Sequence, residues 1–156
     1  RGQHIEGMLR FWPYMAVVDA FQHWVYDNPV AAHDPAACDA AWLKLYRRFH
    51  PDVDIHGVEA ETANGWQQKL HIFQAPFYYV EYGLAQMGAV QVWRNAQRDQ
   101  AGAVRAYRRA LALGGSATLP TLFETAGGRF GFDAALMREL VAAMEQAMHD
   151  LRAAGA

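Results

Sequence analysis

Cysteine is almost absent from this sequence, which has a single one, Cys38, among 156 residues. One cysteine cannot form an internal disulfide and cannot supply the paired thiolates of a structural zinc site. Small residues flank Cys38, and no neighbouring base in the sequence could activate its thiol. We therefore interpret Cys38 as a packed core residue, in preference to a nucleophile, in a protein that does not depend on disulfides.

An excess of positive charge and long apolar runs are also missing. The chain has 14 Lys and Arg against 16 Asp and Glu, a formal net charge of -2, which does not fit a nucleic-acid-binding surface. Its longest charge-free stretches, residues 82–93 and 110–123, are well short of the roughly 20 residues that a membrane span needs. The sequence predicts neither nucleic acid nor a membrane as a partner, and a cytoplasmic location.

Helical patterns dominate what is present. Hydrophobic residues make up 53% of the chain and charged residues 19%, a balance typical of one folded domain with a core. Apolar side chains recur at helical spacing, which predicts an all-α fold, a bundle of about six helices; only residues 66–73 could instead be extended. We expect helices at about residues 3–28, 35–49, 76–97, 101–113 and 119–126 and from 133 onward, with one short helical turn near 59–63.

Two of these predicted helices contain proline or glycine, which disfavour a regular helix. Pro13 lies inside the first pattern and is expected to kink the helix or to end its first half. The segment 76–97 is apolar nearly all round, which predicts a helix that starts near Pro76 and is buried on most sides. Gly83 and Gly88 would weaken that helix, so we expect another backbone to come close to them.

Four metal-ligating side chains lie close together in the stretch between the second helix and the short turn. They are His50, Asp52, Asp54 and His56, and such residues could hold a metal ion. Pro51 prevents a regular helical presentation, and loops rich in these residue types are usually solvated. We favour a solvated loop; a small metal-binding protein remains an alternative.

A carboxylate and an imidazole lie four residues apart in the first predicted helix, at Asp19 and His23. Residues at this spacing share a helix face and can form a hydrogen bond. Such a carboxylate can orient a functional histidine, but the same pair also forms to satisfy a partly buried histidine. We favour the structural role.

The most informative cluster combines an imidazole with phenols. If a helix starts near Pro76, then Tyr78, Tyr79 and Tyr82 share one of its faces, and His71 can fold back over its first turn. Phenols and imidazoles can donate hydrogen bonds to a developing oxyanion. The alternative is an aromatic core, the commoner reason for aromatic residues at helical spacing.

Several segments of the chain match one family in order and spacing. They are residues 13–24 (PYMAVVDAFQHW), 48–54 (RFHPDVD), 68–73 (QKLHIF), 76–86 (PFYYVEYGLAQ), 113–116 (LGGS) and 119–124 (LPTLFE). In these segments the whole chain, residues 1–156, resembles the C-terminal portion of oligoendopeptidase F and related thimet-type zinc metallopeptidases. The resemblance implies a mostly helical catalytic domain with a deep channel that admits short peptides as substrates.

The zinc-binding signature of that family is missing from this sequence. In the family, zinc is held by the two histidines of an HExxH helix and by a Glu on the next helix. No two of the seven histidines here lie four apart with a Glu after the first. The resemblance therefore implies zinc as cofactor of the whole enzyme, with its ligands upstream in the same polypeptide. For this chain alone it implies no metal site and no activity.

The resemblance also assigns roles within the imidazole and phenol cluster. It implies that His71, Tyr79 and Tyr82 are catalytic residues that line the channel and stabilise the tetrahedral intermediate. Within this set Tyr82 is the oxyanion donor and Tyr79 also binds substrate, with Tyr78 as a further substrate-binding candidate. The thimet branch has a glycine-rich flexible loop between the histidine and the tyrosines. Here the link, residues 72–77, contains no glycine, so the sequence does not predict that the link closes over the substrate.

A non-enzymatic helical interaction module is the alternative function. Residues 101–111 resemble half of a tetratricopeptide repeat. No second copy is visible in the sequence, and such arrays need at least about three repeats to be stable. The missing copies favour the peptidase interpretation.

Overall fold

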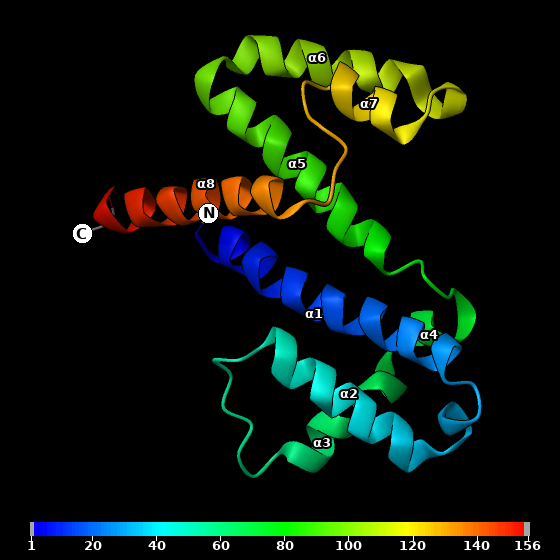
Figure 1. Ribbon diagram of the computed structural model, residues 1–156. Helices are drawn as coiled ribbons and strands as arrows, with labels where there is room; N and C mark the ends of the chain where they lie inside the picture. The colour runs from blue at the N-terminus through cyan, green and yellow to red at the C-terminus, as the bar shows by residue number, and fades with distance from the viewer. Residues whose placement is uncertain (1, 155–156) are drawn as a thin grey trace. The chain divides into compact units, whose positions relative to one another are not determined.

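Eight α-helices and three short 3-10 helices make up the computed structural model, which describes residues 2–154 (Figure 1). The α-helices are α1 (Gly2–Asp27), α2 (Pro35–Phe49), α3 (Glu59–Ala63), α4 (Leu70–Gln74), α5 (Val80–Arg98), α6 (Gln100–Leu113), α7 (Leu119–Thr125) and α8 (Ala134–Ala154). The 3-10 helices are Ala31–His33, Asn64–Gln68 and Gly114–Ser116. No strand occurs within residues 2–154, so the prediction of an all-α fold is confirmed. The ambiguous residues 66–73 are helical except for Lys69, which is extended.

The described residues divide into two compact units. Arg10–Gly83 forms the middle unit, and the described residues before and after it form the terminal unit. Each unit has its own buried side chains and is considered by itself below. Within residues 2–154, none of the helices combines the length and the hydrophobicity that a bilayer crossing requires.

Aromatic side chains of α1 and α2 form the core of the middle unit. Phe21 and Trp42 are almost completely buried, and their rings meet edge-on with centroids 5.3 Å apart. The ring of Trp66 lies 5.8 Å from that of Phe21, and its indole N–H donates to Asp39 Oδ1 at 2.7 Å. These contacts attach the segment before α4 to both helices, and they fix the start of the chain that leads to His71.

Pro13 was expected to kink the first helix or to end its first half, and α1 does not end there but continues through it. A proline inside a helix costs about 3 kcal/mol. Trp12 and Val17 lie on either side of it and are both buried. Burial of such side chains contributes about 1.5–3 kcal/mol each, which is enough to offset the proline.

The start of α5 differs from the prediction. The helix begins at Val80 and not near Pro76, because Phe77 has a backbone φ of 62°. A residue in the left-handed region cannot continue a right-handed helix. Pro76 therefore lies in a turn, closed by the Tyr78 N–H, which donates to the carbonyl oxygen of Ala75 at 3.1 Å.

The apolar sequence of α5 predicted a helix that is buried on most sides. In the structure one of its faces is exposed. Met87 and Val90 are buried, three residues apart on one face. Tyr82, Ala85 and Ala89 are exposed. The exposed alanines line a surface cavity, and Tyr82 belongs to the polar cluster described below, so the second face of α5 has its own use.

Both glycines of α5 face side chains and not another backbone, so that part of the prediction is wrong. A Cβ on Gly83 would lie 2.4 Å from Cε of Met15, and one on Gly88 would lie 2.9 Å from Cε1 of Phe123. Real Cβ atoms essentially never come so close to another heavy atom. The two glycines therefore make room for a methionine and a phenylalanine against the helix.

A buried glutamine fastens the loop before α8 in the terminal unit. Gln91 of α5 accepts from the Arg129 N–H at 2.8 Å and donates through Nε2 to the Arg129 carbonyl oxygen at 3.0 Å. Leu136, Leu140 and Met144 form the buried stripe of α8 that follows this loop. The amide thus satisfies both backbone groups of Arg129 where the chain enters its last helix.

Gln91→Leu is expected to lower the free energy of unfolding by about 1–3 kcal/mol, because it leaves the two backbone groups of Arg129 without partners. Urea denaturation measures the loss. Gln97→Leu is the matched control, since it makes the same change at an exposed position of the same helix and should stay within about 0.5 kcal/mol of the parent. Equal stability of the two variants would contradict this account of Gln91.

Asp133 caps α8 and is paired with Arg129. Its Oδ1 accepts from the Leu136 N–H at 2.9 Å, and its Oδ2 accepts from Arg129 Nη1 at 2.6 Å. The Arg129 hydrogen bond and the backbone N–H of Leu136 lower the pKa of Asp133 from 3.8 to about 2. Because the folded pKa is depressed, this stabilisation is complete above pH 3.8 and is lost as the pH falls towards 2.

A carboxyl carbon NMR titration should place the Asp133 midpoint near 2, and Arg129→Ala should move it back towards 3.8. Arg138→Ala is the control, because it removes the same charge from an exposed position of α8 that forms no hydrogen bond to Asp133 in the structure. A midpoint that does not respond to Arg129→Ala would show that the pair does not set this pKa.

Candidate functional site

The imidazole of His71, on α4, is surrounded by three phenol rings of the middle unit. Its Nε2 lies 3.2 Å from the Tyr82 hydroxyl. Its ring is parallel to that of Tyr78, with centroids 6.2 Å apart, and lies edge-on to the rings of Tyr79 and Tyr82 at 5.1 and 5.6 Å. The structure therefore brings together the four residues that the sequence had grouped. We call them the His71 cluster.

Exposure differs strongly within the His71 cluster. Tyr78 and Tyr82 are 51% and 41% exposed, whereas Tyr79 is 8% exposed. Tyr79 is the buried member of the cluster, and its ring lies 6.3 Å from that of Tyr14 in the core of the middle unit. The accessible hydrogen-bonding groups of the cluster are consequently those of Tyr78, Tyr82 and the half-buried His71.

The buried phenols of Tyr14 and Tyr79 stay protonated at neutral pH. Burial, with a smaller contribution from Tyr46, raises the pKa of Tyr14 to about 12. Burial also raises the pKa of Tyr79, although the nearby Lys69 ammonium acts in the opposite direction. Lys69 Nζ lies 4.8 Å from the centroid of the Tyr14 ring and 5.8 Å from that of Tyr79. A neutral phenol keeps its proton and can donate a hydrogen bond.

The turn that carries the tyrosines is held by α1. The Phe77 N–H donates to Oε1 of Gln22 at 2.7 Å, and the Phe77 ring lies 5.0 Å from the rings of both His23 and Tyr26. Sequence reasoning did not single out Gln22 or Phe77. A signal existed for Gln22, since this amide falls on the same helix face as Val18, four residues before it, which is fully buried.

The pair predicted within α1 also lies at this turn. Asp19 Oδ2 is 3.7 Å from His23 Nε2, beyond hydrogen-bond length. The His23 side chain is largely exposed and packs against Phe77. Neither residue lies against His71, and His23 reaches the His71 cluster through its contact with Phe77.

The loop with four metal-ligating side chains closes on itself. His50 stacks on Tyr46 with ring centroids 4.4 Å apart, and Asp54 Oδ1 accepts from the His56 backbone N–H at 2.9 Å. Nowhere in residues 2–154 do three or more His, Cys, Asp or Glu side chains converge as a metal ion would require. The four side chains of this loop therefore do not fit a zinc site, and we assign them no part in catalysis.

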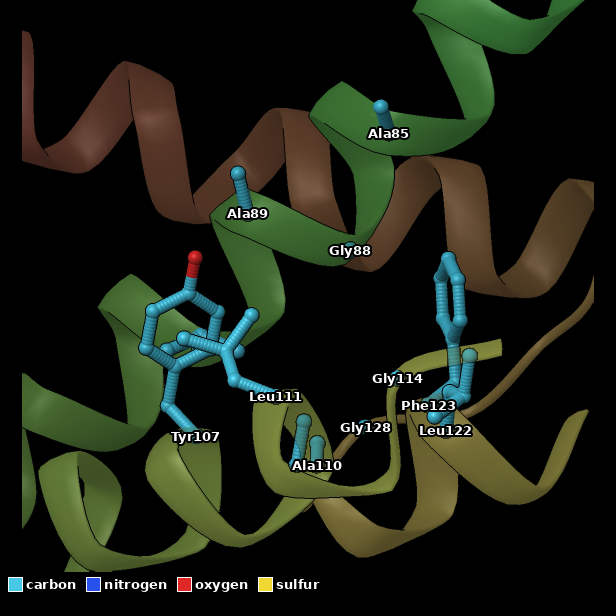
Figure 2. A pocket seen from close by; sticks show the side chains of 12 residues that line it. Ala85, Gly88, Ala89, Tyr107, Ala110, Leu111, Gly114, Leu122, Phe123 and Gly128 are labelled. Carbon is cyan, nitrogen blue, oxygen red and sulfur yellow. The ribbon is translucent and has the colours of Figure 1, made fainter. Parts of the chain in front are cut away.

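An apolar cavity of about 300 Å³ lies among α5, α6 and α7 in the terminal unit. Figure 2 shows Tyr107 and Leu111 of α6 on one side of it, Gly88 and Ala89 of α5 above them, and Leu122 and Phe123 of α7 on the other side. Its only ionisable lining group is the Tyr107 phenol. The cavity has no set of groups for acid–base or nucleophilic chemistry, which leaves the His71 cluster as the candidate active site.

Comparison with known families gives a match over most of the chain. The model of peptidase family M3 matches residues 2–142. The chain belongs to peptidase family M3. This is a family of metallopeptidases, so the resemblance drawn from the sequence segments is confirmed. No curated protein sequence matches the chain significantly.

Two solved structures share the fold closely. A PZ peptidase A crystallised with an inhibitor is 32% identical, with a TM-score of 0.87, and an oligoendopeptidase F is 33% identical, with a TM-score of 0.83. In each comparison the match covers 96% of this chain and 26% of the other. The chain thus spans about a quarter of the length of these M3 relatives.

The contact between His71 and Tyr82 predicts a particular imidazole tautomer. A phenol O–H that donates to Nε2 favours the neutral ring with its proton on Nδ1. Tyr82→Phe is expected to remove this preference, and ¹⁵N chemical shifts of the His71 ring report the change directly. Tyr107→Phe, at an exposed tyrosine of the terminal unit, should leave the His71 signals unchanged. If the His71 tautomer is unchanged in Tyr82→Phe, the hydrogen bond from the Tyr82 hydroxyl to His71 Nε2 is ruled out.

Proposed function

We propose that this chain forms part of a zinc-dependent M3 peptidase that hydrolyses short peptides, and that the His71 cluster is one wall of its substrate channel. The observation that carries the proposal is the contact between His71 Nε2 and the Tyr82 hydroxyl, in an accessible group of phenols, in a chain of this family. Both groups can donate a hydrogen bond, and they lie close enough to reach one oxygen atom together.

Peptide hydrolysis gives these donors a task. Attack of water on the scissile carbonyl places negative charge on its oxygen, and preorganised donors that reach this oxygen lower the barrier. In this proposal the Tyr82 hydroxyl turns from His71 Nε2 towards the oxyanion. The imidazole exchanges its proton through water from Nδ1 to Nε2 and donates beside it. The surrounding rings keep both side chains in place, so protons move while the heavy atoms reorganise little.

The surface around the cluster suits an extended peptide. Leu70, Phe73 and Phe77 are exposed apolar side chains within a few residues of His71. Exposed apolar side chains of this kind can contribute to a binding site. We assign substrate binding to Tyr78 and Tyr79, and the low exposure of Tyr79 favours Tyr78 as the phenol that a peptide meets first.

The remaining machinery lies outside residues 2–154 in this proposal. The zinc ligands belong to another part of the same polypeptide, expected upstream, because the described residues offer no metal site and the solved relatives are about four times longer. The partners of the chain are then that upstream part and the peptide substrate. Asp19 steadies His23, which supports the cluster only through Phe77. A cytoplasmic location is the expectation for such an oligopeptidase.

The test uses the polypeptide as its source cell makes it, after its intact mass has shown whether a longer chain exists. Tyr82→Phe and His71→Ala are each expected to lower kcat/KM for a short peptide by about 10²–10³-fold, because each removes one oxyanion donor. Zinc content should stay at the parent level in both variants. Tyr78→Phe is expected to act mainly on KM, since it changes binding in the ground state.

Tyr107→Phe is the control, because it removes the same hydroxyl from an exposed site outside the cluster. Parent-like kcat/KM in Tyr82→Phe would contradict the proposal. So would stoichiometric zinc and peptide cleavage by the isolated 156-residue chain, since both are expected to be absent from it.

A further inference from the structure

The backbone at Phe77 is in a conformation that its side chain disfavours. Among residues 2–154 it is the one residue other than glycine with positive φ, at 62°. Bulky side chains rarely adopt this region, and such a residue persists only where its surroundings hold it. The strained residue lies immediately before Tyr78, so its φ angle decides where the tyrosine-bearing turn points.

Gln22 is the group that holds it. Its side chain is 1% exposed, and its Oε1 accepts the Phe77 N–H at 2.7 Å across 55 residues of sequence. Its Nε2 has no hydrogen-bond partner among the described residues. An amide flip would aim two donors at the Phe77 N–H, so the acceptor orientation is kept although it leaves a buried N–H₂ group unsatisfied.

Two further residues of α1, close to Gln22, hold the side chain of Phe77. His23 and Tyr26 pack against the Phe77 ring, each with a centroid distance of 5.0 Å. Backbone and side chain of Phe77 are therefore both fixed by one stretch of α1. The same stretch begins at Phe21, which is anchored in the core against Trp42.

We infer that Gln22 is a positioning residue for the His71 cluster, because it locks Phe77 in its left-handed conformation and so sets the Tyr78 and Tyr82 rings against His71. The link of residues 72–77 is then a preset turn and not a loop that closes on substrate. The chemical meaning of this inference rests on the proposed function. Its structural content does not, since the geometry of the His71 ring can be observed without any turnover.

The readout is the His71 ring by NMR, in the protein with ¹⁵N-labelled histidine. The tautomer reports the bond from Tyr82, and the ring-current shift of its carbon-bound protons reports the stacked Tyr78. His71→Gln identifies the signals. Gln22→Met keeps the size of the side chain but removes the acceptor, and it is expected to abolish both signatures while the other histidines away from α1 stay unchanged.

Gln22→Glu is the rescue variant. A carboxyl group offers an oxygen acceptor to the Phe77 N–H whether or not it is protonated, so both signatures should return under the conditions of the parent measurement. Parent-like signals in Gln22→Met would overturn the inference, and so would a Gln22→Glu protein that behaves like Gln22→Met.

Phe77→Pro keeps the test decisive if Gln22→Met does not fold. Phe77 is exposed, so this change spares the core, yet proline has no N–H and fixes φ at a negative value. Loss of both His71 signatures is expected, and their retention would refute the positioning role. If the signatures respond as expected but the whole polypeptide cleaves no peptide, the proposed function fails while this inference stands.

Discussion

The buried face of α1 is the constraint on which the candidate site depends. Its fully buried residues Val17, Val18 and Phe21 anchor the helix against Trp42 of α2. The next residue, Gln22, continues this face and presents an acceptor to the backbone that leads into α5. Packing and polar positioning thus come from consecutive residues of one helix.

The residues of the His71 cluster differ in burial, from the buried Tyr79 to the accessible Tyr82. Tyr79 is held among core rings, and its raised pKa reflects the loss of water around its hydroxyl. Tyr82 keeps the same chemical group accessible, within hydrogen-bond distance of His71. Rings that contact on several sides restrict each other's rotation. Under the proposed function, these side chains meet a substrate with their positions already set, which favours stabilisation of an oxyanion.

The sequence predicted much of this arrangement from two kinds of signal. Helical periodicity identified the all-α class and most helices, because buried stripes dominate their stability. The spacing of His71, Tyr79 and Tyr82 predicted the cluster that the structure brings together, and its chemistry is proposed from the family. The failures lay where tertiary packing overrides local preference. Pro13 was tolerated because its neighbours are buried, and Pro76 did not start α5 because Phe77 has positive φ.

No local pattern could have revealed that φ angle, since nothing in the letters around Phe77 calls for a left-handed residue. Glycine would adopt it without strain, but glycine would also sample other angles freely and would leave the turn mobile. A phenylalanine adds a ring that His23 and Tyr26 can hold, and it depends on Gln22 to stay in place. The strain is thus tied to a buried contact 55 residues away. The core of the middle unit and the turn that carries the tyrosines are thus joined through α1.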